Sequence, residues 1–170
     1  MTTQTLSFAE LDAGAGSSDF TPGDVFEGAS MRSTLLELSD EVFRTEVEAG
    51  RDAGGGPLHR HLHQEERFIV EEGTLRVHTG LRGSRLVGAG ERISVPAGTP
   101  HTFSVVGDGA RFVAEFTPPL RVADYFLELF ALDDPGLRDI ARLAGRYPRE
   151  HFYLPVIPPV LQRALLRPLA

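Results

Sequence analysis

The sequence predicts an all-β protein, an antiparallel β-barrel or sandwich with a helical appendage at its C-terminal end. Between residues 31 and 118, short runs that favour strands follow one another closely, separated by glycine-rich or charged turns and by no helical segment. After Pro118-Pro119 the apolar residues change to the spacing of an amphipathic helix. Closely spaced strands without intervening helices are typical of antiparallel barrels and sandwiches.

Residues 1–30 are rich in Gly, Ser, Asp and Thr, and they are expected to form a loosely ordered arm that could include one short edge strand. Residues 31–118 are expected to form the β-barrel. Its predicted strands are MRSTLLEL, VFRTEV, RFIV, TLRVHT, RISVPA, HTFSVV and RFVAEFT. Glu72-Gly73 is expected to be a tight turn between two of these strands, with Gly73 at positive φ.

Residues 119–170 are expected to form helices that pack on the barrel. The first helix has an apolar stripe with helical spacing, made of Val122, Tyr125, Phe126, Leu129 and Phe130. Asp134-Pro135 is a start signal for a second helix, and Pro158-Pro159 can open a third. We interpret the aromatic residues of the stripe as packing residues rather than as a lid over a substrate.

Composition excludes several classes of function. The chain has 170 residues, the size of one domain, and no cysteine, which excludes a catalytic thiol, a zinc ribbon, an iron–sulfur cluster and disulfides. All 17 basic residues are arginine, so neither a Schiff-base lysine nor a P-loop is possible. The net charge is −7 and no segment is strongly basic, so we expect no nucleic-acid partner. No long apolar run is present, so we expect no membrane partner and a cytoplasmic protein.

The residues that carry chemistry gather in two clusters. The first is PLHRHLHQEERFIVEEG, in which His59 and His61 would project to the same face of an extended strand. Imidazoles so placed can reach one metal ion at about 2.0–2.1 Å each. Glu66 opens the next strand on a mostly apolar face, where a carboxylate needs a cation beside it to stay ionised. The second cluster, GERISVPAGTPHTF, places His101 just after a Pro-Ala-Gly turn.

These clusters resemble the two sequence motifs of the cupin superfamily. The first resembles G-x5-H-x-H-x3/4-E-x6-G, although Gly54 stands one residue early for the opening glycine. The second resembles G-x5-P-x-G-x2-H-x3-N, with Val105 in place of the final asparagine. The matching positions are His59, His61, Glu66 and Gly73 in the first motif, and Gly90, Pro96, Gly98 and His101 in the second.

The resemblance implies a cupin-type β-barrel of the double-stranded β-helix or jelly-roll kind, as in small bacterial cupins. It also implies one divalent transition metal ion held by His59, His61, Glu66 and His101. The ion could be Fe, Mn, Ni, Co, Cu or Zn. Three neutral imidazoles and one carboxylate leave a net positive centre with open coordination positions, which favours an anionic ligand.

The leading functional hypothesis is a quercetin dioxygenase-like enzyme that acts on a small enolate-like or phenolic substrate together with O2. Glu66 would be both a ligand and the general base. The predicted pocket residues are His63 near the barrel mouth and the inward-facing Phe68, Val70, Phe103 and Val105. A redox-neutral isomerase, cyclase or lyase, and a non-enzymatic module that binds a small molecule, remain alternatives. We also expect a homodimer, from family habit and from the apolar stripe at residues 122–130.

Overall fold

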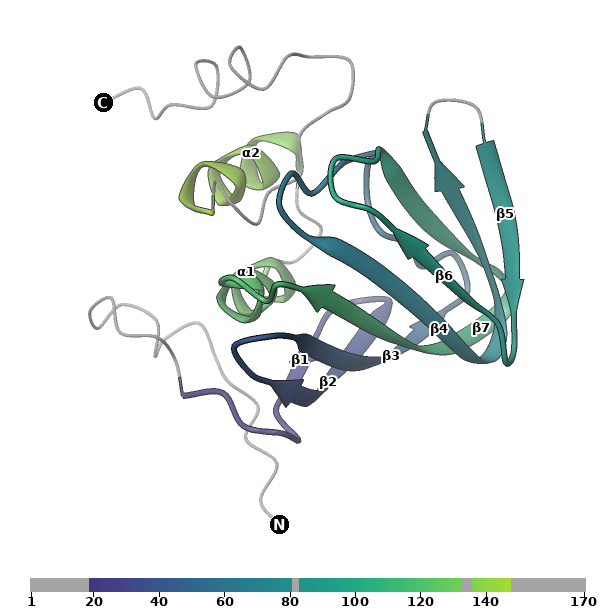
Figure 1. Ribbon diagram of the computed structural model, residues 1–170, viewed down its shortest axis with the longest axis horizontal. Coiled ribbons are helices and arrows are strands. Elements are labelled where there is room, and N and C mark those ends of the chain that lie inside the picture. Colours follow the sequence, from purple (N-terminus) through teal and green to yellow (C-terminus); the bar gives the residue numbers. More distant parts are fainter. Residues whose placement is uncertain (1–18, 81–82, 133–135, 148–170) are drawn as a thin grey trace.

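The computed structural model describes residues 19–80, 83–132 and 136–147 of the chain, and it confirms an antiparallel β-fold of jelly-roll type followed by helices (Figure 1). The sheet follows the path β1-β2-β3-β7-β4-β5, and β6 pairs with β4 beside that path. The strands are β1 (Val25–Glu27), β2 (Met31–Leu38), β3 (Phe43–Gly50), β4 (Glu65–Thr79), β5 (Gly83–Gly88), β6 (Arg92–Val95) and β7 (His101–Thr117). The helices are α1 (Val122–Phe130) and α2 (Leu137–Arg146).

Strands β4 and β7 are long, and they bend together halfway along their length. The first half of β4 pairs with the last half of β7, so that Glu66 lies opposite Phe116. Beyond the bend, Thr79 at the end of β4 lies opposite His101 at the start of β7. Both strands therefore contribute to both halves of the barrel.

The bend depends on Gly73, which has a φ of 75°. A Cβ atom at this position would collide with the backbone carbonyl oxygen of Gly109 on β7. The expectation of positive φ is correct, but the expected tight turn is not: β4 continues through Glu72-Gly73, and the pairing register shifts on both sides of Glu72. Four of the predicted strands accordingly merge into β4 and β7.

Two short strands, β1 and β5, lie outside the list of strands predicted from the sequence. β1 lies inside the segment predicted as an arm, and it pairs with β2 at the edge of the sheet. β5 was not among the predicted strands. Its first four residues are all exposed and only Val87 is buried, so the segment lacks the alternation that marks a strand.

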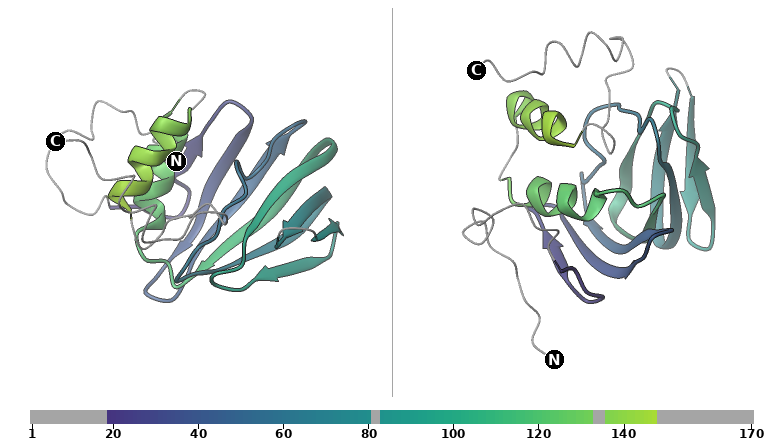
Figure 2. Two further views of the ribbon diagram at one scale, coloured as in Figure 1. Left: turned by 90° about the horizontal axis from the view of Figure 1, so that it is seen from above. Right: turned by 60° about the vertical axis from the view of Figure 1, so that its left-hand side comes forward.

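Helix α1 closes one end of the barrel, directly after β7 (Figures 1 and 2). Its Phe126 ring contacts three barrel rings, those of Phe26, Phe43 and Phe116, with centroid distances of 6.2, 5.3 and 5.5 Å. Burial of these aromatic rings is the main force that holds the helix on the barrel. The interpretation of the aromatic stripe as a packing surface thus holds for Phe126.

Helix α2 packs on α1 rather than on the sheet. The rings of Tyr125 and Tyr147 lie 5.8 Å apart, and Leu143 is buried beside them. The stripe at residues 122–130 is therefore used within the chain and supplies no argument for the homodimer, which stays a prediction. The helix predicted to open at Pro158-Pro159 lies outside the described residues.

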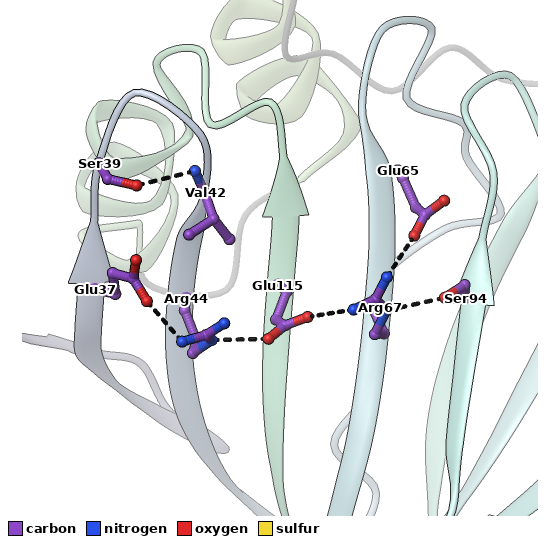
Figure 3. Close-up of polar contacts among 8 residues, drawn as sticks. All are labelled: Glu37, Ser39, Val42, Arg44, Glu65, Arg67, Ser94 and Glu115. Carbon is purple, nitrogen blue, oxygen red and sulfur yellow. Dashed lines mark hydrogen bonds and ion pairs between the residues drawn. The ribbon is translucent and has the colours of Figure 1, made fainter.

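A row of alternating charges crosses the outer face of the sheet (Figure 3). Its centre is Glu115 on β7, whose side chain is only 10% exposed. Arg44 on β3 donates to Glu115 at 2.7 Å, and Arg67 on β4 donates to it at 3.1 Å. Arg44 also reaches Glu37 on β2, and Arg67 reaches Glu65 and Ser94. The row thus links five neighbouring strands through side chains.

Neither helix in the described ranges is long and apolar enough to cross a lipid bilayer.

Candidate metal centre

The four predicted metal ligands come together inside the barrel. His59 and His61 lie on the segment between β3 and β4, Glu66 on β4 and His101 at the start of β7. One potential ligand atom from each residue lies within 4.8 Å of the others. The four residues are between 2% and 7% exposed, so the group is removed from bulk water.

Backbone hydrogen bonds hold the two sequence clusters together. The amide of His59 donates to the carbonyl of His101 at 2.9 Å, and the amide of His101 donates back at 2.6 Å. The amide of Gly98 donates to the carbonyl of His61 at 2.6 Å. Two ligands of the first cluster are therefore fixed against the second cluster through the main chain, independently of any ion.

The Pro-Ala-Gly turn shapes this connection. The amide of Thr99 donates to the carbonyl of Pro96 at 3.1 Å, which closes a four-residue turn. Gly98, at the third position of the turn, has a φ of 80°, a conformation that glycine adopts without strain. An added Cβ would meet no atom within 4 Å, so the glycine is required by its conformation and not by lack of space.

Two of the histidines are oriented by backbone carbonyls. The Nδ1 atom of His59 lies 2.8 Å from the carbonyl oxygen of Pro57, and that of His101 lies 2.9 Å from the carbonyl oxygen of Thr99. A carbonyl accepts only, so each Nδ1 carries the proton and each Nε2 is directed to the centre. Metal-binding histidines are commonly held in this way.

The carboxylate of Glu66 lies among these imidazoles. Its Oε2 atom is 2.6 Å from Nε2 of His101 and 3.4 Å from Nε2 of His61. Burial alone would raise the pKa of Glu66, but the hydrogen bonds and charges of His101 and His61 hold it well below its usual range. Burial opposes protonation of His101, yet the hydrogen bond to Glu66 raises the pKa of His101. Each of the two residues thus stabilises the charged form of the other.

The pKa of His59 is shifted in the opposite direction to that of His101. Burial, together with the charges of His61 and His101, lowers its pKa to about 3. The imidazole of His59 is therefore neutral at physiological pH, which is the form that binds metal.

The donor set fits a divalent transition metal. Imidazole nitrogens and one carboxylate oxygen are ligands that such ions prefer. Two nitrogens bound to one ion at about 2.1 Å can be at most about 4.2 Å apart, close to the spread of the ligand atoms here. An ion would also replace the proton that His101 shares with Glu66.

The predicted pocket residues lie in two different surroundings. Phe68 and Val70 are each 1% exposed and belong to the hydrophobic core, while Phe103 and Val105 are partly buried and pack against that core. The Phe103 ring lies 5.4 Å from that of Phe68. His63 is exposed. Contact of these five residues with a substrate stays a prediction.

Val105 and the glycines of the first motif serve the packing of the barrel. The amide of Val105 donates to the carbonyl of Ala53 at 3.0 Å, where the motif would place asparagine. Gly54 pairs with Ser104, and a Cβ there would lie 2.7 Å from the carbonyl oxygen of Phe103. A Cβ on Gly55 would lie 2.8 Å from the ring of Phe103. Both glycines are required because the loop and β7 approach closely.

Three residues beside the ligands were not recognised from the sequence as part of the site. Gln64 is 1% exposed and precedes Glu66 by two residues. The Phe116 ring stands edge-on against His61, with 5.6 Å between ring centroids. Tyr125 on α1 is 4% exposed, and burial together with the negative charge of Glu66 raises its pKa. Only Gln64 had a sequence signal, its position between the ligands.

An open groove of about 830 Å³ lies at the opposite end of the barrel, next to the bend. It is lined by residues 28–32, 48–51, 72–73 and 108–111, and it contains none of the four ligands. Its charges are largely paired with one another, for example Arg32 with Glu48 and Arg111 with Glu72. The groove therefore has no part in the chemistry of the buried group.

Comparison with known proteins agrees with this description. A family model described as a cupin domain matches residues 43–114. Among solved structures, KdgF from a Halomonas species is 18% identical, with a TM-score of 0.52 over 56% of this chain and 86% of that chain. An RmlC-like cupin from Shewanella frigidimarina is 20% identical, with a TM-score of 0.50 over 68% of this chain and 92% of that chain.

Oxalate decarboxylase from Bacillus subtilis is 19% identical, with a TM-score of 0.51 over 63% of this chain and 31% of that chain. At these identities the similarity shows a common fold and nothing finer. No curated protein matches the chain.

Proposed function

We propose that the chain, as a member of the cupin superfamily, is an enzyme. Its activity would depend on one divalent transition metal ion held by the buried histidine and glutamate group. Its substrate would be a small organic molecule that binds as an enolate or a phenolate. The reaction proposed is a dioxygenation, in which both atoms of O2 enter the substrate.

The convergence of His59, His61, Glu66 and His101 carries this proposal. Two of these imidazoles are oriented by backbone carbonyls, and His59 is neutral because it is buried. A group that served only to stabilise the fold would not need its ligand atoms to face one another at the cost of burying a carboxylate. The arrangement is one that a cation completes.

When bound, the metal would supply positive charge that stabilises an anionic oxygen of the substrate, and a path for electrons to O2. Glu66 is ionised at neutral pH, because its pKa lies below its usual range. Its carboxylate is thus able to take a proton from a substrate hydroxyl or from an acidic C–H group beside it. Phe68, Phe103 and Phe116 would surround the substrate with apolar surface and exclude water.

The experiment has two steps. Elemental analysis of the purified full chain identifies the metal, and an oxygen electrode then follows O2 uptake with that metal and a panel of flavonols and β-diketones. Glu66→Gln is expected to abolish uptake. Glu65→Gln is the matched control, because Glu65 is the neighbouring acid but its side chain is 40% exposed and pairs with Arg67. The control is expected to keep wild-type uptake.

Each result has a definite meaning. A protein that holds no metal after loading contradicts the proposal as a whole. Turnover under strict anaerobiosis would replace the dioxygenase by a redox-neutral isomerase, cyclase or lyase. Tight binding of a panel member without any turnover would leave a small-molecule-binding module.

A further inference from the structure

The side chain of Gln64 lies on the interior side of the chain, next to Glu66. Along the start of β4, burial alternates: Gln64, Glu66 and Phe68 are buried, while the residues between them are partly exposed. Gln64 is 1% exposed, less than any of the four predicted ligands. A polar side chain so deeply buried needs hydrogen-bond partners.

The orientation of the Gln64 carboxamide is fixed. Its Nε2 donates to the carbonyl oxygen of Pro118 at 2.9 Å and to that of Pro119 at 3.0 Å. Carbonyl oxygens accept and cannot donate, so the amide nitrogen must face the prolines. Both amide hydrogens are used in this way, so Oε1 is the atom of the carboxamide that does not bond to the prolines.

Oε1 of Gln64 is buried, and it has no hydrogen-bond partner in the part of the chain that the structure describes. An amide oxygen removed from water without a donor is unfavourable. Such an atom is therefore suited to receive a donor that enters with a bound molecule.

The surroundings connect this atom with the metal centre. Pro118 and Pro119 lead directly into α1, whose Tyr125 is near enough to Glu66 for the charge of Glu66 to affect it. The residue before this turn, Thr117, is paired with Glu65 on β4. Gln64, Glu66 and the start of α1 are thus neighbours in the fold.

We infer that Gln64 is a specificity-determining residue, whose Oε1 accepts a hydrogen bond from a hydroxyl group of the ligand bound at the metal centre. The substrates selected would carry an O–H group on the atom next to the one that bears the anionic oxygen. This description covers enediols and catechols, and an α-hydroxycarboxylate is a simple probe with the same arrangement of anionic oxygen and neighbouring O–H group. The inference rests on the proposed function, because the anionic oxygen must be held by the metal.

The test uses the full chain loaded with Co²⁺ and two small carboxylates. Glycolate has the donor hydroxyl, whereas methoxyacetate has the same oxygens without the O–H hydrogen. Their dissociation constants follow from the change in the visible absorption of Co²⁺ on titration. The wild-type protein is expected to bind glycolate about tenfold more tightly than methoxyacetate, as for one buried hydrogen bond. Equal affinities would overturn the inference.

The variant Gln64→Met keeps the size of the side chain and removes both its polar functions. We expect it to bind glycolate about tenfold more weakly than the wild type, with methoxyacetate affinity unchanged. Tyr147→Phe is the control for loosening of the helices, because it removes only the hydrogen bond from Tyr147 to Glu128. This control is expected to keep the preference for glycolate. If Gln64→Met retains the wild-type preference, the inference is wrong.

The two proposals fail in different ways. A wild-type protein that does not bind Co²⁺, or a His101→Ala variant that still gives the glycolate-dependent absorption change, contradicts the metal centre itself. Normal Co²⁺ binding with equal affinity for the two carboxylates contradicts only the role of Gln64. If Gln64→Met does not fold, the wild-type comparison of glycolate with methoxyacetate decides.

Discussion

Nε2 of His101 lies 2.6 Å from Oε2 of Glu66, although neither residue is a strand partner of the other. Glu66 pairs with Phe116 and Val95, and His101 pairs with Thr79. The contact exists because β4 and β7 bend together and bring their outer ends face to face. The geometry of the candidate metal centre therefore depends on the bend as much as on the motifs.

Removal of His101 tests the ligand group. His101→Ala is expected to lower the affinity for Zn²⁺ or Co²⁺ by at least about 100-fold, because the loss of a ligand costs no less than the loss of a residue that supports one. It should also abolish the difference in Tm between metal-loaded and chelator-treated protein, since binding stabilises only the folded state.

The control is His78→Ala, because His78 lies farther along β4, opposite Ser84 and Thr102 and outside the ligand group. It should keep wild-type metal content. A His101→Ala protein with unchanged metal content by elemental analysis would refute the assignment.

Metal affinity should fall as the pH is lowered. The pKa of His101 is raised by Glu66, so His101 is protonated below that raised value and must lose its proton before it can bind an ion. His59, with a pKa of about 3, stays neutral and does not compete. The apparent affinity is expected to fall about tenfold for each pH unit below the raised pKa of His101.

Titration calorimetry in two buffers of different ionisation enthalpy measures the protons released on binding. We expect proton release by His101 to grow as the pH falls through its raised pKa, and His59 to release none. An affinity that is constant between pH 8 and pH 5 would show that protons do not compete with the metal at His101.

Adding even a methyl group at Gly73, in the bend of β4, should destabilise the fold. Gly73→Ala places a Cβ against the carbonyl of Gly109 at a residue with positive φ. We expect a loss of about 2–4 kcal/mol in the free energy of unfolding, from the backbone conformation and the clash together. Gly90→Ala is the matched control, because Gly90 has a similar φ of 81° and a Cβ there would meet nothing within 4 Å.

Gly90→Ala should cost only the conformational part, about 1–2 kcal/mol. Urea denaturation of both variants measures the difference. Equal losses would mean that β4 and β7 are not in close contact at the bend.

The row of charges on the outer face should contribute to stability through Glu115. Glu115→Gln is expected to lower the free energy of unfolding by about 1 kcal/mol, because the carboxylate is largely buried while Arg44 and Arg67 are partly exposed and screened by water. Asp108→Asn, at an ion pair whose carboxylate side chain is 87% exposed, should change stability by less than about 0.5 kcal/mol. A larger effect at Asp108 than at Glu115 in denaturant titrations would contradict this ranking.

The ligand set could be predicted from the sequence because its four residues stand at the fixed positions of the two cupin motifs. One residue separates His59 from His61, so an extended segment places both on the same side, and Gly98 marks the turn that precedes His101. The backbone pairing of His59 with His101 was not predicted and is a finding of the structure.

Other parts of the site arise from contacts that the sequence pattern does not encode. Gln64 is bound to Pro118 and Pro119, more than 50 residues away, and nothing in its immediate neighbours indicates those partners. Tyr125 follows the helical apolar spacing and was therefore read as a packing residue. β5 is exposed along most of its length, so its formation depends on pairing with β4 rather than on its own residues.

The division of the chain after Thr117 has a consequence for how such a protein could change. The four candidate ligand side chains all precede residue 102. Helix α1 follows residue 117, and it is held next to them by the bonds of Gln64 to Pro118 and Pro119 and by the contact of Phe116 with Phe126. Replacing the segment that contains α1 would change which substrates can bind, without changing the four candidate ligands. Related proteins could thus come to act on different substrates by changes in the segment after Thr117, while the four candidate ligands stay the same.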